Sequence, residues 1–204
     1  KKGIAEAELL ISEGNELAAA EILAPIVKGD SDHNTYARIT LVDLLDPKSS
    51  YGQSRNAESA VKLMQLLDST DTLPERIEFL AHSYMERFAD QPLYAQELAK
   101  LVIQHTVDDE HKSKIGETRF QWMSELLSDD SVEINIDFIT DWALLAEQLD
   151  NCNECVTHLQ PFANKLADGE GARILGQYLN AQGQSAQAEP HLSAYVNTML
   201  PKLI

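Results

Sequence analysis

Two cysteines and a histidine are spaced so that they could carry chemistry. Cys152, Cys155 and His158 follow one another at intervals of three residues, and the chain contains no other cysteine. Such a pair could cycle between thiol and disulfide, because the dipole of a helix start acidifies the first thiol of a CxxC motif. The three residues could also bind a metal ion. The sequence therefore allows a redox-linked or metal-linked helical protein that uses Cys152, Cys155 and His158.

The surrounding sequence favours a packing role for Cys155. A redox CxxC motif belongs to a strand-to-helix turn, and no block of this chain shows the period-two alternation of a strand. A structural zinc site uses four ligands, usually in two pairs, and there is no second cysteine pair. Since cysteine is a small, readily buried side chain, we expect Cys155 in the core. We expect Cys152 to be more exposed, with no packing role that the sequence defines.

The remaining residues show no pattern of a catalytic or metal site. The six histidines lack the HExxH spacing, and the chain has no GxSxG motif and no phosphate-binding glycine loop. The acidic run Asp108–His111 suits a helix start, where carboxylates stabilise the positive end of the dipole. We therefore expect no catalytic residue, no cofactor and no metal. An enzyme of an unrecognised helical type stays open, and it would require Asp, Glu and His in one buried pocket.

The composition predicts an all-α protein. Aromatic residues make up only 6% of the chain, and apolar residues recur at helical spacing in blocks separated by turn residues such as Gly14, Asp150 and Gly183. Pro25 and Pro161 lie inside two of these blocks, and we expect them to bend their helices. The predicted helices cover residues 3–13, 16–28, 34–45, 54–68, 74–88, 92–105, 111–127, 136–149, 152–165, 169–182 and 185–198.

The charge balance restricts the partners. With 16 basic and 33 acidic side chains, the net charge is −17. Such a surface repels nucleic-acid phosphates and anionic lipids, so we expect no nucleic-acid binding and a protein partner with a basic face. The most apolar stretch, Ala18–Val27, is interrupted by Glu21 and is shorter than the roughly 18 residues of a membrane span. We therefore expect no direct membrane insertion.

Three parts of the chain share one pattern of small and apolar residues. Cys155 occupies the position that Ala19 and Ala188 hold in the other two, and it precedes Ala188 by 33 residues. This pattern resembles the tetratricopeptide repeat, a helical hairpin of about 34 residues. The connection over residues 46–56 resembles the longer loop of Sel-like repeats. The matching residues are Leu10, Gly14, Ala19, Leu23 and Ile26; Trp142, Ala143, Ala146, Asp150, Cys155, Leu159 and Phe162; and Leu175, Gly176, Leu179, Gly183, Ala188, Leu192 and Tyr195.

The resemblance implies a right-handed superhelical array of antiparallel helical hairpins, with about 11 helices in one domain over residues 1–204 that belongs to a larger protein. It implies a non-enzymatic scaffold that binds a protein or peptide on a concave face formed by the first helix of each hairpin. The Sel-like loop implies kinship with bacterial envelope proteins that organise polysaccharide export, and both cytoplasm and periplasm stay open. The implied groove residues are Asp137, Thr140, Leu144, Glu147, Arg173, Gln177 and Asn180, with Ile4, Glu8 and Ile11 equivalent in the first hairpin.

Overall fold

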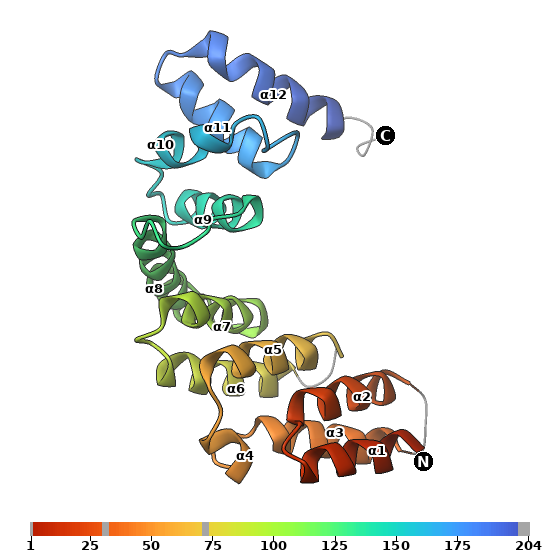
Figure 1. Cartoon of the computed structure of the whole chain (residues 1–204). Coiled ribbons are helices and arrows are strands. Elements are labelled where there is room, and N and C mark those ends of the chain that lie inside the picture. The colour runs from red at the N-terminus through yellow and green to blue at the C-terminus, as the bar shows by residue number, and fades with distance from the viewer. Residues whose placement is uncertain (1, 30–32, 71–73, 200–204) are drawn as a thin grey trace. The chain divides into compact units, whose positions relative to one another are not determined.

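The structure, a computed structural model, describes residues 2–29, 33–70 and 74–199, and the regular structure within these ranges is helical (Figure 1). This confirms the predicted all-α class, while the superhelical arrangement stays a prediction. The helices divide into two compact units, Lys1–Trp122 and Met123–Ile204; the prediction of one domain is not tested. Within the described ranges, no helix is both long enough and apolar enough to cross a membrane.

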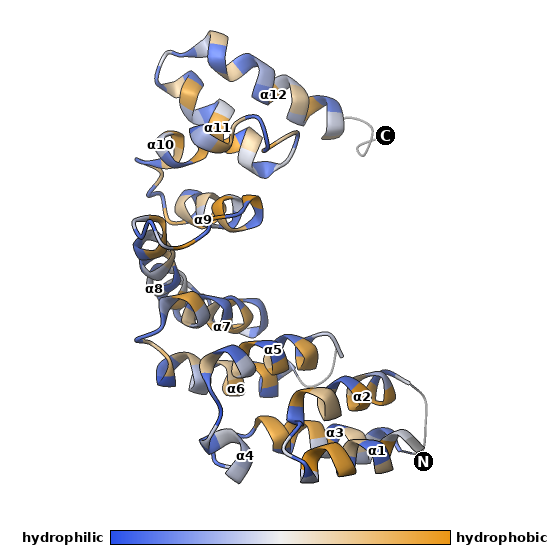
Figure 2. Ribbon diagram, viewed as in Figure 1, coloured by the Kyte–Doolittle hydropathy of each residue, from blue (hydrophilic) through white to orange (hydrophobic). Residues whose placement is uncertain are grey.

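The first unit consists of helices that pack onto their neighbours in the sequence. Helices α1 and α2 form one antiparallel hairpin and α6 and α7 another, while α2 also contacts α3 and α5 (Figure 1). Each of α1, α2 and α3 carries hydrophobic residues interspersed with polar ones (Figure 2). The helices of this unit are α1 (Lys2–Ser12), α2 (Glu16–Lys28), α3 (Asn34–Leu45), α4 (Ser50–Gln53), α5 (Ala57–Asp68), α6 (Pro74–Arg87), α7 (Pro92–His105) and most of α8 (Asp109–Leu127).

A buried arginine connects three parts of the first unit. The guanidinium group of Arg55 donates to the carbonyl of Leu44 and to a carboxylate oxygen of Glu16, and its Nη1 lies 3.2 Å from the hydroxyl of Tyr84. That hydroxyl in turn donates to the carbonyl of Leu45 at 2.8 Å. Helices α2, α3 and α6 are therefore joined by hydrogen bonds as well as by apolar contacts, which favours one fixed packing arrangement.

The second unit is built around α9 and α11. Asn135 begins α9 by accepting a hydrogen bond from the backbone N–H of Phe138 at 2.8 Å, as an N-capping side chain does. Helix α9 contacts both α10 and α11, and α11 forms an antiparallel hairpin with α12 (Figure 1). The elements are the end of α8, α9 (Ile136–Gln148), α10 (Cys155–Leu159), the 3₁₀ turn η1 (Gln160–Phe162), α11 (Glu170–Ala181) and α12 (Ser185–Met199).

Three helices end in turns of the same type. Gly14, Asp150 and Gly183 have positive φ angles of 77°, 53° and 79°, and each lies two residues after the last residue of α1, α9 or α11. Glycine adopts this left-handed conformation without strain, and Asp adopts it more readily than most residues. The repeat pattern assigns these three residues to one position. In each turn the next N–H donates to the carbonyl five residues earlier: Asn15 to Leu10 (2.8 Å), Asn151 to Ala146 (2.8 Å) and Gln184 to Leu179 (2.9 Å).

Small residues lie where the two helices of a hairpin approach one another. Ala19, Cys155 and Ala188 are 0%, 0% and 1% exposed. A Cβ added to Gly176 would lie 2.7 Å from the Cγ of Leu192 and 3.3 Å from the carbonyl oxygen of Ala188. Helices α11 and α12 therefore touch at the small residues that the repeat pattern places at the crossing, and the predicted burial of Cys155 is confirmed.

The prediction of one helix over residues 152–165 is wrong. The structure has only α10 and η1 there, and the helix begins at Cys155. The backbone N–H groups of Asp150 and Asn151 close the end of α9 by donating to the carbonyls of Glu147 and Ala146. Pro161 lacks the N–H that would continue α10, and residues 163–165 form turns instead of a continued α-helix. Pro25, by contrast, does lie inside α2.

Candidate functional site

The predicted groove residues of the second unit are divided between α9 and α11. Along α9, Asp137, Thr140, Leu144 and Glu147 recur at intervals of three or four residues, which places them on one side of the helix. Asp137 is exposed, while the other three are partly buried. Because α9 contacts α11, this side of α9 can share a surface with residues of the next hairpin.

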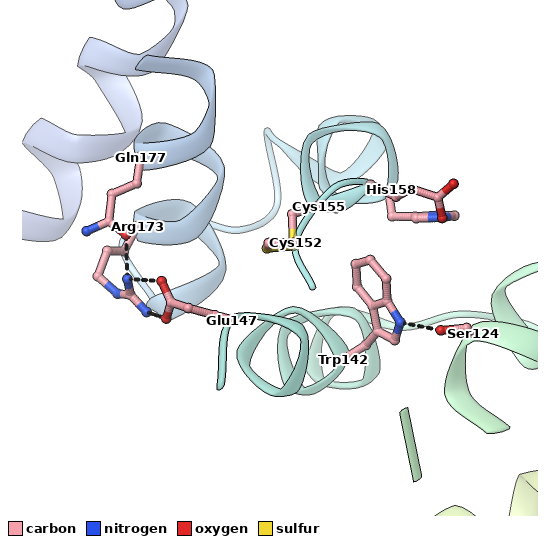
Figure 3. The surroundings of a disulfide bond; sticks show 9 residues. Ser124, Trp142, Glu147, Cys152, Cys155, His158, Arg173 and Gln177 are labelled. Carbon is pink, nitrogen blue, oxygen red and sulfur yellow. Dashed lines mark hydrogen bonds and ion pairs between the residues drawn. A yellow bond between two sulfur atoms is a disulfide. The ribbon is translucent and has the colours of Figure 1, made fainter. Parts of the chain in front are cut away.

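Arg173 of α11 joins the two helices. Its Nη1 and Nη2 donate to the two carboxylate oxygens of Glu147 at 2.9 and 2.5 Å and form a bidentate ion pair (Figure 3). Its Nη1 also donates to the side-chain oxygen of Gln177 at 2.6 Å, and its Nε donates to Glu170 at 2.5 Å. The structure thus brings together three of the predicted residues, Glu147, Arg173 and Gln177. It adds Glu170, which sequence reasoning did not single out.

The charges of this cluster compensate one another. The guanidinium group of Arg173 holds the pKa of Glu147 and the pKa of Glu170 below their usual range, because its hydrogen bonds stabilise the charged carboxylates. Tyr195 donates to Glu170 at 2.7 Å, and this contact raises the pKa of the tyrosine. Since Arg173 already binds two carboxylates, the cluster carries a negative balance. A cationic group is therefore the better match for it.

The other predicted residues have more local contacts. Thr140 lies against α11, because a Cβ added to Gly171 would be 2.9 Å from its hydroxyl oxygen. Asn180 accepts a hydrogen bond from the hydroxyl of Ser185 at 2.8 Å, across the turn between α11 and α12. Leu144 is only partly buried. The side of α9 and α11 that carries these residues, here called the α9–α11 face, is therefore polar with one apolar residue.

The two cysteines form a disulfide bond between the turn before α10 and the first residue of α10 (Figure 3). Their Cα atoms are 5.0 Å apart, and the N–H of Cys155 also donates to the carbonyl of Cys152 at 3.2 Å. Cys152 is 7% exposed and Cys155 is 0% exposed, so Cys152 is the more exposed of the two, as expected, although both are buried. The bond folds Cys152 back onto α10, which gives it the packing role that the sequence did not define.

His158 does not join the cysteines in a ligand set. Its ring contacts the edge of Trp142, with 5.0 Å between ring centroids, and its Nε2 lies 3.5 Å from a carboxylate oxygen of Glu154. Trp142 donates its indole N–H to Ser124 at 3.0 Å. Across the described residues, no group of three or more His, Cys, Asp or Glu side chains is arranged to hold a metal ion.

A second surface lies in the first unit, between α1 and α3. Ile4, Ala5, Glu8, His33 and Tyr36 line an open depression of about 380 Å³. The Tyr36 hydroxyl donates to Glu8 at 2.6 Å, and this hydrogen bond raises the pKa of the tyrosine. Sequence reasoning had marked Ile4 and Glu8 as groove-facing, and both line the depression.

Two details of this surface differ from the sequence prediction. Ile11, the third residue marked in the first hairpin, packs against the hydrophobic core instead. His33 and Tyr36 were not predicted as site residues. Helical periodicity identifies which side of a helix is exposed, but it does not show which residue of another helix lies opposite.

Comparison with known proteins supplies no family for the chain: no family model, no curated protein and no solved structure matches it. The resemblance to tetratricopeptide and Sel-like repeats therefore stays a prediction. It rests on the shared residue pattern and on the turns and helix crossings described above.

Proposed function

We propose that this protein is a non-enzymatic scaffold of tetratricopeptide-like hairpins that binds another protein through the α9–α11 face. The observation that carries the proposal is the ion pair between Glu147 and Arg173. It holds α9 and α11 side by side, so that predicted groove residues from two successive hairpins share one surface. Such a surface suits an extended peptide or a partner helix.

The partner that we propose is a protein segment with a basic face. The net charge of −17 attracts such a segment. The Arg173 cluster adds a local excess of carboxylates, and exposed Asp137 stands on the same side of α9. Recognition of this kind is electrostatic and screened by salt, so partner binding should weaken as the ionic strength rises.

The test compares two charge reversals in affinity capture of the partner. Asp137→Lys changes the proposed face, while Glu189→Lys makes the same charge change on α12, where the side chain is also exposed. We expect the captured protein to be lost with Asp137→Lys, retained with Glu189→Lys and released from the unchanged protein by salt. Equal capture by both variants, or capture that is independent of salt, would contradict the proposal.

A second candidate, thiol–disulfide exchange, is favoured by one observation, the Cys152–Cys155 bond. Exchange requires a thiolate to reach a sulfur atom in line with the bond, and both residues are buried. We therefore rank this function below the scaffold. Two measurements distinguish this function from the scaffold. Mass spectrometry after dithiothreitol reduction and alkylation of the native protein shows how fast the disulfide is reduced, and metal analysis shows whether a metal ion is bound. A disulfide that is reduced as fast in the native as in the unfolded protein would favour exchange.

A further inference from the structure

The depression between α1 and α3 combines apolar walls with one carboxylate, Glu8, that pairs with no cation among the residues that the structure describes. Ile4 and Ala5 contribute the apolar wall from α1, and the ring of Tyr36 faces them from α3. Glu8 accepts from Tyr36, and among the ion pairs found in the described ranges none includes Glu8. The hydroxyl of Tyr36 is neutral, so it positions this carboxylate without offering it an opposite charge.

Exposed apolar residues continue along the same two helices. Leu9 is 57% exposed and follows Ala5 by one helical turn, while Tyr36 and Ile39 are 46% and 55% exposed and one turn apart. Several large apolar side chains are rarely exposed next to one another on a soluble protein unless a partner covers them. The α1–α3 surface is therefore an apolar strip with a negative charge beside it.

The charged residues nearby also favour a cationic ligand for this surface. Glu6 and Glu13 of the first hairpin are exposed as well, so Glu8 has further carboxylates on its own helix and in the turn that follows it. A comparable depression between α2 and α5 contains Lys62 and Glu21, and there Lys62 pairs with Glu58 at 2.6 Å. Glu21 likewise belongs to none of the ion pairs found in the described ranges, but the apolar residues beside it, Leu17 and Leu66, are partly buried. Of these two depressions, the one between α1 and α3 therefore combines such a carboxylate with exposed apolar residues.

We propose that the α1–α3 surface binds a protein segment that places an aliphatic or aromatic side chain in the depression and a flanking Lys or Arg on Glu8. This inference rests on the proposed scaffold function for its premise that the protein binds another protein. It adds a second contact surface, in the first unit, and states which residue types that surface selects. The apolar side chain supplies affinity through burial, and the cation supplies selectivity through Glu8.

The test uses short synthetic peptides with a Gly-Ser background and a central Lys-Phe-Lys, Lys-Ser-Lys or Glu-Phe-Glu sequence. Binding to the full chain is followed by fluorescence anisotropy and by amide chemical shifts in nuclear magnetic resonance spectra. We expect Lys-Phe-Lys to shift the amides of α1 and α3, and to bind about tenfold more tightly than Lys-Ser-Lys, because burial of the ring is lost with serine. Glu-Phe-Glu should bind more weakly again, since its charges repel Glu8.

Glu8→Gln tests the carboxylate without removing the Tyr36 contact, because an amide oxygen also accepts a hydrogen bond. It should weaken Lys-Phe-Lys binding about threefold, the size expected of one exposed ion pair. Glu13→Gln removes the same charge from the turn after α1 and should leave the affinity within a factor of about 1.5. Unchanged circular dichroism and melting temperature will show that both variants fold.

Three results would overturn the inference. One is no shift in α1 or α3 at about 1 mM peptide, a concentration that detects even weak binding. Another is equal loss with Glu8→Gln and Glu13→Gln, which would mean attraction by overall charge alone. The third is self-association that disappears with Ile39→Ser, which would assign the surface to a second copy of the chain. Amide shifts in α9 and α11 report the proposed function independently, so the two proposals can fail separately.

Discussion

The carbonyl oxygen of Asp46 occupies the space that a side chain on Gly52 would need. A Cβ added to Gly52 would lie 1.9 Å from that oxygen and 2.8 Å from the Cα of Pro47. The short helix α4 begins when the hydroxyl of Ser49 accepts from the N–H of Gly52 at 2.9 Å, and Arg87 donates to the Gly52 carbonyl at 2.7 Å. The long connection between α3 and α5 is therefore a packed element.

Gly52→Ala should destabilise the protein strongly. Because the clash is with backbone atoms, the connection must shift, and we expect a loss of about 2 kcal/mol or more in the free energy of unfolding. Gly29→Ala is the matched control, since its added Cβ would lie 3.6 Å from the carbonyl oxygen of Pro25, an ordinary contact. That control should change stability by less than about 0.5 kcal/mol. Urea denaturation measures both, and equal effects would contradict this account of Gly52.

Arg55→Met should destabilise the first unit. The Arg55 side chain is 1% exposed and that of Glu16 is 22% exposed, so loss of the cation leaves a partly buried carboxylate and the carbonyl of Leu44 without their partner. We expect a loss of about 3 kcal/mol. Arg76→Met removes an exposed pair with Asp46, 3.6 Å apart, and should cost within about 1 kcal/mol. Similar losses in the two variants, measured by urea denaturation, would show that the Arg55 network contributes little.

The elements of the fold differ in how far the sequence predicts them. The turns at Gly14, Asp150 and Gly183 were predictable because each depends on residues within one turn of the chain. The shortening of α10 was not, because Pro25 and Pro161 have the same local setting and only Pro161 ends its helix. Local pattern does not determine whether the residues after a proline continue as a helix.

The candidate surfaces, too, could be predicted only in part. The repeat pattern placed Glu147 and Arg173 on equivalent sides of successive hairpins, although it did not predict that they pair. Residues 26 positions apart meet there, and 28 positions separate Glu8 from Tyr36. Such partners depend on how helices are aligned along one another, which periodicity leaves undetermined.

The stability of the second unit should depend on pH through Arg173. Because Arg173 lowers the folded-state pKa of Glu147 and of Glu170, their contribution is complete above the unfolded pKa of about 4.3. It is lost as the pH falls through the folded-state values. Arg173→Met should cost about 1 kcal/mol at pH 7, since these pairs are partly exposed, and this cost should shrink as the pH falls below about 4. A difference from the unchanged protein that is constant with pH would contradict this, and Arg76→Met serves as the control.

The disulfide should stabilise the second unit by restricting its unfolded chain. Closing a loop of about four residues contributes on the order of 2 kcal/mol in the loop-entropy model, and the short α10 offers few helical hydrogen bonds to replace it. Reduction with dithiothreitol should therefore lower the melting temperature. Cys155→Ala should show the same loss and no further response to dithiothreitol. Alanine suits this buried position, because Ala19 and Ala188 fill it in the other hairpins.

Cys155→Leu separates the bond from the packing. Both variants lack the disulfide, but leucine is too large for a position that is 0% exposed, so we expect a further loss of about 1–3 kcal/mol. Calorimetry of the two variants, with and without dithiothreitol, measures both contributions. If Cys155→Leu were as stable as Cys155→Ala, the position would not require a small residue. The equivalence of Cys155 with Ala19 and Ala188, and with it the repeat pattern in this hairpin, would then be wrong.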